Sequence, residues 1–118
     1  KNNLPHKVMI DCSHGNSNKD FKKQGNVLEN VAQQINNGEK NILGVMLESH
    51  IQEGNQKLVN KKSLEYGKSI TDACIDIKTT EDLLSKLYSS IKWMVYNFVT
   101  EILKNIEVII GTVKLSIP

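Results

Sequence analysis

The chain has 118 residues, a length that allows one modest domain, and its formal net charge is +2. All 15 basic residues are lysine, and their near balance with 13 acidic residues argues against a protein that binds nucleic acid. Arginine, the side chain best suited to bidentate binding of phosphate, is absent. If the chain handles phosphorylated substrates, we expect their strongest anchors to lie outside it.

Two cysteines, Cys12 and Cys74, lie in apolar runs. Their spacing matches no zinc motif and does not suggest the disulfide scaffold of a small secreted protein. We therefore expect reduced thiols and a cytoplasmic location. The chain does not begin with methionine, and the first apolar run starts only a few residues after Lys1, so we expect further sequence to precede it.

The first predicted element is a short buried strand over residues 7–12 that ends in a polar turn. The apolar residues from Val8 to Ile10 run into Asp11, Cys12, Ser13 and His14, and a Gly-Asn-Ser sequence typical of a turn before a helix follows. His14 therefore stands where the strand ends. In an α/β barrel, that end of the strands is the catalytic face.

A helix and a second strand are predicted to follow. Helical spacing over residues 19–37 marks one apolar face, made of Phe21, Val27, Leu28, Val31, Ala32 and Ile35. Gly25 weakens this helix by roughly 1 kcal/mol relative to alanine, and the Asn36-Asn37-Gly38 sequence favours its end. Residues 42–47 form a strand that is apolar on both faces, as expected for a parallel strand covered on both sides. Together these elements predict a βαβ unit.

Residues 49–78 have the composition of a long loop, which we interpret as functional because it leads to Asp72. The residues from Thr79 to Asp82 predict the capped, acidic start of a last helix. Its buried side is predicted to consist of Leu83, Leu84, Leu87, Tyr88 and Ile91.

The tail from Trp93 to Pro118 can continue this helix. Its apolar residues recur every three or four positions, at Val95, Val99, Ile102, Ile106 and Ile109. Polar residues such as Asn97 and Glu101 interrupt the run too often for a membrane span. We favour a helix that packs on the protein's own surface over one that lies on a membrane surface or binds a partner.

Three metal-capable side chains follow or adjoin apolar runs: His14, Glu48 and Asp72. A divalent cation binds best to a few hard or borderline ligands that are held by rigid elements. The three residues belong to separate elements, so their spacing alone does not prove that they meet. Without further information, the favoured interpretation is a histidine at a strand end and two solvated carboxylates.

Other residues near these positions admit a functional and a structural interpretation. His50 is a rival ligand, although a single histidine more often packs or forms hydrogen bonds. Cys12 can be a thiolate ligand only if the metal lies low in the barrel, and a buried, inert cysteine is favoured. Lys19 and Lys68 flank the candidate site and can meet a phosphate, but most lysines in such loops are solvated. The amides of residues 15–17 are a weak candidate for binding an anion at a helix start.

Three motifs in order carry a resemblance to a known family: Asp11-Cys12-Ser13-His14-Gly15-Asn16-Ser17, the segment from Gly44 to His50 with Glu53-Gly54-Asn55-Gln56, and the segment from Tyr66 to Ile75. Together they resemble the class I, aromatic-amino-acid-regulated 3-deoxy-7-phosphoheptulonate (DAHP) synthases. The resemblance covers residues 7–92 without an obvious gap.

The resemblance implies an α/β fold, the C-terminal portion of a (β/α)8 TIM barrel with its last two strands and helices. Residues 1–92 would be this barrel piece, and residues 93–118 match nothing in the family and would be a helical extension. The family condenses phosphoenolpyruvate with erythrose 4-phosphate and water to give DAHP and phosphate, the first step toward chorismate and the aromatic amino acids. The full-length protein is expected to be a homo-oligomer, and residues 1–118 alone are expected to be inactive.

The resemblance also assigns roles to single residues. It implies that His14 is a metal ligand beside phosphoenolpyruvate, that Glu48 is a metal ligand, and that Asp72 is a ligand near the aldose phosphate. His14 and Asp72 are thereby expected to act in catalysis and in substrate binding. The metal is left open among manganese, iron, cobalt and zinc. The family's fourth ligand, a cysteine on the first barrel strand, lies outside this chain.

Two further expectations concern the residues after Ile75. After Ile75 the family usually has Gly-Trp, whereas this chain has Asp76 and Ile77, which predicts a different local turn. The alternative to an enzyme is a non-enzymatic α/β interaction module that docks a partner through the helix at residues 93–110.

Overall fold

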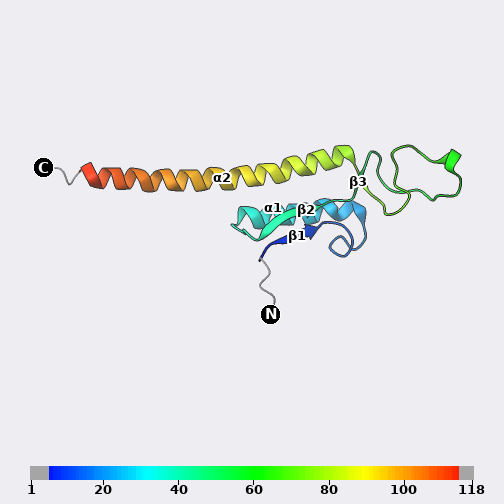
Figure 1. Ribbon diagram of the computed structural model, residues 1–118, viewed down its shortest axis with the longest axis horizontal. Helices are drawn as coiled ribbons and strands as arrows, with labels where there is room; N and C mark the ends of the chain where they lie inside the picture. Colours follow the sequence, from blue (N-terminus) through cyan, green and yellow to red (C-terminus); the bar gives the residue numbers. More distant parts are fainter. Residues whose placement is uncertain (1–5, 115–118) are drawn as a thin grey trace.

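The computed structural model describes the backbone of residues 6–114, and the side chains of this range except those of 93–94 and 103–114. Strands β1 (Val8–Asp11) and β2 (Ile42–Met46) pair in parallel. The connection between them contains the short 3-10 helix η1 (Phe21–Lys23) and helix α1 (Gln24–Asn36). The predicted βαβ unit is therefore confirmed (Figure 1).

Helix α1 begins later than predicted and ends as predicted. Lys19 has a left-handed φ of 60°, which excludes it from a right-handed helix. Asp20 instead caps η1 by accepting a hydrogen bond from the Lys22 N–H at 3.1 Å. At the other end Gly38 has a φ of 95° and its N–H donates to the Ile35 carbonyl, which is typical of a glycine-terminated helix.

The prediction that β2 is covered on both faces is wrong for this chain. The register with β1 shifts between Val8 and Met9, which pair with Ile42 and Gly44 and leave Leu43 unpaired. Leu43 is 75% exposed, and Val8 and Met9 are also exposed. Because the sheet contains only these two strands, much of its apolar surface has no neighbour among the described residues.

A second, very short parallel pair lies within the segment predicted as a loop. Strands β3 (Ser49–His50) and β4 (Ile75–Asp76) pair with each other, and the 3-10 helix η2 (Lys61–Ser63) lies between them in sequence. The Gln56 side chain ties this loop together, since it donates to the carbonyls of Glu65 and Lys68 and accepts from the Glu65 N–H. These bonds give the loop a defined shape, and Asp72 lies near its end, three residues before β4.

Helix α2 (Ile77–Lys114) begins two residues before the predicted Thr79–Asp82 cap. The reason is Asp76, whose carboxylate accepts a hydrogen bond from the Thr79 N–H at 2.7 Å and so caps the helix. The Thr80 hydroxyl adds a bond to the Asp76 carbonyl. The departure from the family's Gly-Trp therefore places a helix cap at this position.

The core lies where α1 and the start of α2 pack against each other and the sheet. It is formed by Cys12, Leu28, Ile75 and Leu83. Gly25 permits this packing, because a β-carbon there would lie 3.3 Å from a methyl group of Leu83. Leu87 also packs on the core, but Leu84, Tyr88 and Ile91 are 48%, 66% and 40% exposed, so their predicted burial is wrong. One helix, α1, covers only a narrow stripe of α2.

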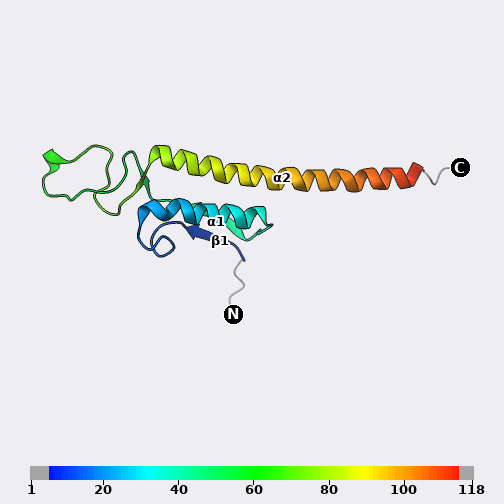
Figure 2. The same cartoon turned by 180° about the vertical axis from the view of Figure 1, so that it is seen from behind.

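Helix α2 extends well past the rest of the molecule in both views (Figures 1 and 2). This continuity confirms that the tail is helical as far as Lys114. Val95, Val99 and Ile102 are each about half exposed, which contradicts the preferred interpretation that they pack on the protein's own surface. Ile106 and Ile109 have no described side chains, and residues 1–5 and 115–118 lie outside the described residues. Within the part described, no helix is both long and apolar enough to cross a membrane.

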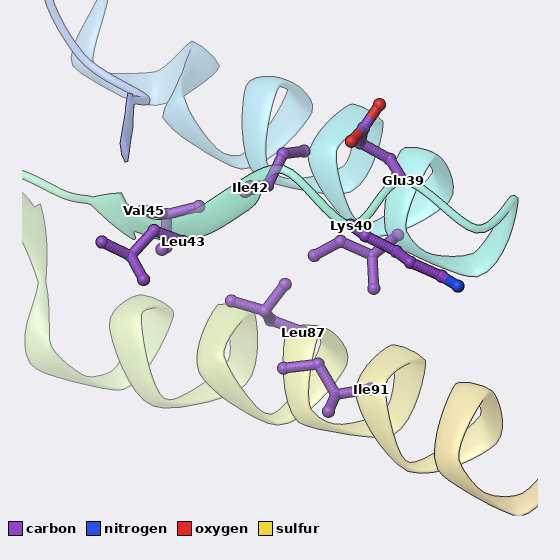
Figure 3. Close-up of a pocket in the computed structure, with 9 residues that line it drawn as sticks. Glu39, Lys40, Ile42, Leu43, Val45, Leu87 and Ile91 are labelled. Carbon is purple, nitrogen blue, oxygen red and sulfur yellow. The ribbon is translucent and has the colours of Figure 1, made fainter. Parts of the chain in front are cut away.

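An apolar groove of about 300 Å³ separates β2 from the first turns of α2 (Figure 3). Leu43 and Val45 line it from the strand, and Leu87 and Ile91 line it from the helix. The groove shows that apolar surface of both elements remains uncovered within the described chain.

Candidate metal centre

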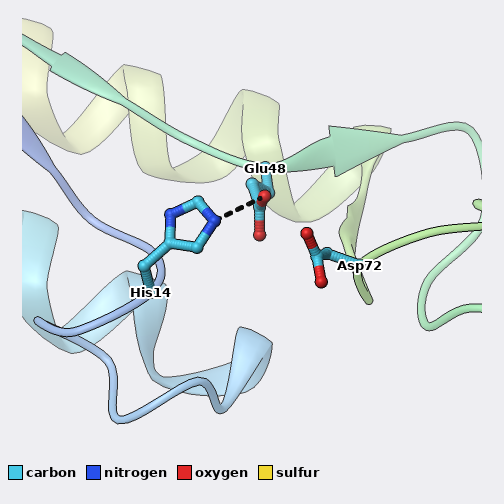
Figure 4. Close-up of side chains that lie close together, drawn as sticks. All are labelled: His14, Glu48 and Asp72. Carbon is cyan, nitrogen blue, oxygen red and sulfur yellow. Dashed lines mark ion pairs between the residues drawn. The ribbon is translucent and has the colours of Figure 1, made fainter.

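Three side chains converge at the carboxyl ends of β1 and β2 (Figure 4). His14, Glu48 and Asp72 each offer one ligand atom, and these atoms lie within 4.8 Å of one another. Among the described residues this is the only cluster of three or more acidic, histidine or cysteine side chains with such spacing. They border a cavity of about 310 Å³ that Lys19 and Phe21 also line. The structure thus brings together all three predicted ligands.

His14 is placed by the turn that follows β1. Its backbone has a left-handed φ of 46°, an unfavourable conformation for a residue with a side chain. The Lys19 N–H donates to the His14 carbonyl at 2.7 Å and helps to hold this turn. The ring's Nδ1 lies 2.8 Å from an oxygen of Asp11, and its Nε2 lies 3.3 Å from Oε1 of Glu48. The imidazole is therefore oriented with Nε2 toward the cluster.

Glu48 follows β2 and is held by both its backbone and its side chain. Its N–H donates to the side-chain oxygen of Gln24 at 2.8 Å, and its carbonyl accepts from the Gln24 amide at 3.1 Å. The Ser13 hydroxyl donates to Oε2 of Glu48 at 2.5 Å. Oε1 is the oxygen that faces His14. The carboxylate thus has one oxygen bound to the protein and the other turned toward the cluster.

Asp72 comes from the loop that leads into β4. The Ile75 N–H donates to the Glu48 carbonyl at 3.0 Å, which ties this loop to the end of β2. Cys74 donates from its thiol to the Asp72 carbonyl at 3.5 Å. In Figure 4 the Asp72 carboxylate points toward Glu48.

The negative charges of the site act on His14. The hydrogen bond to Asp11 is the main cause that raises the pKa of His14 above its usual value, and the charge of Glu48 adds to it. The same hydrogen bond lowers the pKa of Asp11. The charges of Glu48 and Asp72 act in the same direction as Asp11, because nearby negative charges favour the protonated, positively charged imidazole.

The other candidates lie apart from this cluster. His50 is not part of it, and its Nδ1 accepts a hydrogen bond from the Ile51 N–H. Cys12 is fully buried in the core, and burial raises the pKa of its thiol, which fits the inert role that was favoured. Lys68 pairs with Glu65 at 3.3 Å, whereas Lys19 lines the cavity itself.

Three supporting residues were missed by sequence reasoning: Asp11, Ser13 and Gln24. Asp11 and Ser13 stand three and one residues before His14, so the local sequence contained a signal, a carboxylate beside a candidate ligand. Gln24 is fully buried at the start of α1 and 24 residues from Glu48. Only the folded arrangement shows that its amide reaches the backbone of Glu48.

Comparison with known proteins supports the resemblance found in the sequence. The family model described as the DAHP synthetase I family matches residues 1–85. The Phe-sensitive phospho-2-dehydro-3-deoxyheptonate aldolase of Escherichia coli (strain K12) is 56% identical over 92 residues, which are 78% of this chain and 26% of that protein. The tyrosine-inhibited enzyme of the same name from Candida albicans is 49% identical over 90 residues, 73% of this chain and 24% of that protein.

A solved structure agrees with these sequence matches. The phospho-2-dehydro-3-deoxyheptonate aldolase of Francisella tularensis SCHU S4 matches with a TM-score of 0.69 and 48% identity, over 75% of this chain and 25% of that one. This chain therefore spans about a quarter of the length of the relatives it matches. A family model that covers most of the chain, together with these identities, establishes that the chain belongs to the DAHP synthetase I family.

Proposed function

We propose that this chain is the closing piece of a 3-deoxy-7-phosphoheptulonate synthase and that it contributes three metal ligands to that enzyme's active site. The reaction would join phosphoenolpyruvate to erythrose 4-phosphate with the addition of water, giving DAHP and phosphate. The observation that carries the proposal is the convergence of His14, Glu48 and Asp72 at the ends of two adjacent parallel strands. The non-enzymatic alternative is not favoured, because the matched relatives bear the name of an enzyme.

The donor set suits a divalent cation. One imidazole nitrogen and two carboxylate oxygens form a mixed set of borderline and hard ligands that fits manganese, iron, cobalt or zinc. Their atoms lie close enough for one ion to contact all three. When bound, such a cation supplies a Lewis acid that polarises a carbonyl oxygen and a template that orients two reactants.

The residues of this chain would act by holding and orienting. His14 would present Nε2 to the cation while Asp11 fixes its ring, and Glu48 would present one oxygen while Ser13 binds the other. Asp72 would bind from the opposite loop, near the aldose phosphate. Lys19 would add a positive charge to the cavity beside them. The protein's contribution is then orientation and the neutralisation of charge in a fixed geometry.

The rest of the enzyme would come from sequence that this chain does not contain. We propose that residues 1–92 are the last two strands and helices of a (β/α)8 barrel, with residues 93–118 as an extension. The exposed Leu43 and the groove beside it support this proposal, because these are surfaces that a neighbouring strand of a closed barrel would cover. A fourth ligand and the anchors for both phosphate groups would lie on the missing strands.

Binding of Mn²⁺ to the 118-residue chain tests the metal centre. Glu48→Gln keeps the size of the side chain and removes its charge. Loss of a residue that only hydrogen-bonds to a metal ligand weakens metal binding roughly 10- to 100-fold. We expect loss of the ligand's own charge to weaken Mn²⁺ binding by more than that. Free Mn²⁺ can be followed by its electron paramagnetic resonance signal. The control is Glu81→Gln, which removes the same charge from the exposed surface of α2. Equal affinity of the two variants would contradict the assignment.

A further inference from the structure

We infer that Gln24 is a positioning residue of the metal centre: its buried side-chain amide fixes the backbone of Glu48 and thereby sets the direction of the Glu48 carboxylate. This inference rests on the proposed metal centre and extends it to a residue that touches none of the three candidate ligand atoms. The contacts that carry it are two hydrogen bonds, from the Glu48 N–H to the Gln24 oxygen at 2.8 Å and from the Gln24 nitrogen to the Glu48 carbonyl at 3.1 Å.

The pair of bonds reproduces what a neighbouring strand would supply. A side-chain amide carries one acceptor and one pair of donors in the arrangement of a peptide group. The ladder between β1 and β2 ends with Asp11 opposite Met46, and β3 begins at Ser49. Glu48 therefore lies between the two ladders and is not among the residues that either ladder pairs. The side chain of Gln24, the first residue of α1, supplies the acceptor and the donor that the Glu48 backbone needs.

The position of Gln24 makes this arrangement stable. The residue is 0% exposed, so its amide must find partners within the protein, and leaving them unpaired would be unfavourable by about 1–3 kcal/mol for each group. Leu28, one helical turn further on, is equally buried in the core. The amide is therefore held by a packed helix rather than by a mobile loop, and it can transmit that rigidity to Glu48.

The Glu48 carbonyl also links the other two ligands to the same point. It accepts a second hydrogen bond from the Ile75 N–H, and Ile75 stands three residues after Asp72. On the other side, the turn that bears His14 continues through η1 directly into Gln24. The three segments that carry the candidate ligands thus meet at the pair formed by Gln24 and Glu48, and a displacement there would change the distances within the cluster.

The test replaces Gln24 with methionine, which is similar in volume and length but forms neither hydrogen bond. We expect Gln24→Met to weaken Mn²⁺ binding about 10-fold, the lower end of the range for outer partners of metal ligands. The matched control is Val31→Ala, which removes buried volume from the same helix about two turns after Gln24 and lowers stability while leaving the Gln24 amide in place. Gln24→Met must weaken binding while Val31→Ala, at an equal or greater loss of thermal stability, leaves Mn²⁺ affinity unchanged.

Hydrogen exchange of the Glu48 amide gives a readout that needs no metal. In the wild-type chain this N–H donates to Gln24 and should exchange slowly, whereas Gln24→Met should leave it without this acceptor and speed its exchange. Equally slow exchange in both proteins, or equal Mn²⁺ affinity of wild type and Gln24→Met, would overturn the inference alone. A wild-type chain that bound no Mn²⁺ would overturn the metal centre itself, and the role of Gln24 in it.

Discussion

The His14 ring is oriented by a carboxylate on the side that faces away from Glu48. An ionised aspartate only accepts hydrogen bonds, so the bond of 2.8 Å to Asp11 places a proton on Nδ1. In the neutral ring the lone pair is then on Nε2, the atom 3.3 Å from Glu48. A hydrogen-bonded carboxylate behind a metal-binding histidine is a common means of fixing the tautomer and orientation of the ligand.

This contact predicts how Mn²⁺ binding depends on pH. The metal binds the neutral ring, and the hydrogen bond to Asp11 raises the pKa of His14 above the usual 6.5, so protons compete with the metal to a higher pH than for an isolated histidine. We therefore expect Mn²⁺ affinity to rise with pH until the pH exceeds that raised pKa. Asp11→Asn removes the main cause of the shift and should move the midpoint of this rise to lower pH.

Titration of Mn²⁺ at several pH values, from about 5 to 8, measures the midpoint directly. The control is Asp82→Asn, an equal loss of charge on the exposed face of α2. A midpoint that stayed in place in Asp11→Asn would show that Asp11 does not govern the protonation of His14.

At the scale of elements, the packing of α1 on α2 depends on a narrow stripe. Leu28 is fully buried between the helices, whereas Leu84, on α2, is 48% exposed. Leu28→Ala should lower the free energy of unfolding by about 2–5 kcal/mol, because it leaves a cavity in a small core. Leu84→Ala should change it by less than about 0.5 kcal/mol. Urea denaturation of the two variants checks both values, and a larger effect at Leu84 would mean that the apolar stripe of α2 is covered in solution.

The Asp76 cap at the start of α2 should make the stability of the protein depend on pH. Hydrogen bonds from the side chain and backbone of Thr79 lower the pKa of Asp76 below the usual 3.8. A carboxyl with a lowered pKa in the folded state contributes stability above its unfolded pKa, and this contribution is lost as the pH falls through the folded value. Asp76→Ala should lower the thermal midpoint at neutral pH. Asp76→Asn, which also caps helices well, should keep most of the stability and remove this part of its acid dependence.

Circular dichroism of the three proteins at neutral and acidic pH would measure these effects. If Asp76→Ala unfolded at the same temperature as the wild-type chain, the first turn of α2 would not depend on this cap.

The elements that could be predicted are those whose apolar residues follow a clear period. Strands β1 and β2 and most of α1 were found in this way. The start of α1 was misplaced because Lys19 fits a helix in sequence, although it adopts a left-handed backbone conformation. Strands β3 and β4 have two residues each, too few to show an alternation. Thr79–Asp82 is a plausible cap by composition, but Asp76 forms the cap first.

The three candidate ligands were singled out from the sequence, but the residues that support them were not. The three candidate ligands follow recognisable motifs, and the structure brings them together. The contact between Gln24 and Glu48 joins a side chain to a backbone 24 residues away, and a backbone group leaves no mark in the sequence. Gln24 is one of several polar residues near the predicted helix start, and only the structure shows that it is buried.

At the scale of the whole molecule, the chain holds the candidate metal centre at the end of an open, two-stranded sheet. Two parallel strands cannot close a barrel, and their edges and the exposed Leu43 need neighbours. Arginine, the side chain best suited to binding phosphate, does not occur among the 118 residues. We therefore expect the chain to bind Mn²⁺ and yet to show no turnover of phosphoenolpyruvate and erythrose 4-phosphate.

A chimera can test whether this chain lacks turnover only because the rest of the barrel is missing. The Escherichia coli relative is 56% identical over the matched 92 residues, so a chimera can join the preceding part of that enzyme to this chain. If residues 1–92 are a competent closing piece, the chimera should release phosphate from both substrates with Mn²⁺ present, and its Glu48→Gln variant should not. A second chimera that ends at Lys92 tests the extension, and it should be as active as the first, because the candidate ligands and their supports all precede that residue. Turnover by the 118 residues alone would contradict the requirement for a closed barrel. An inactive chimera that still binds Mn²⁺ would show that the three ligands are in place but that the barrel around them is not correctly formed.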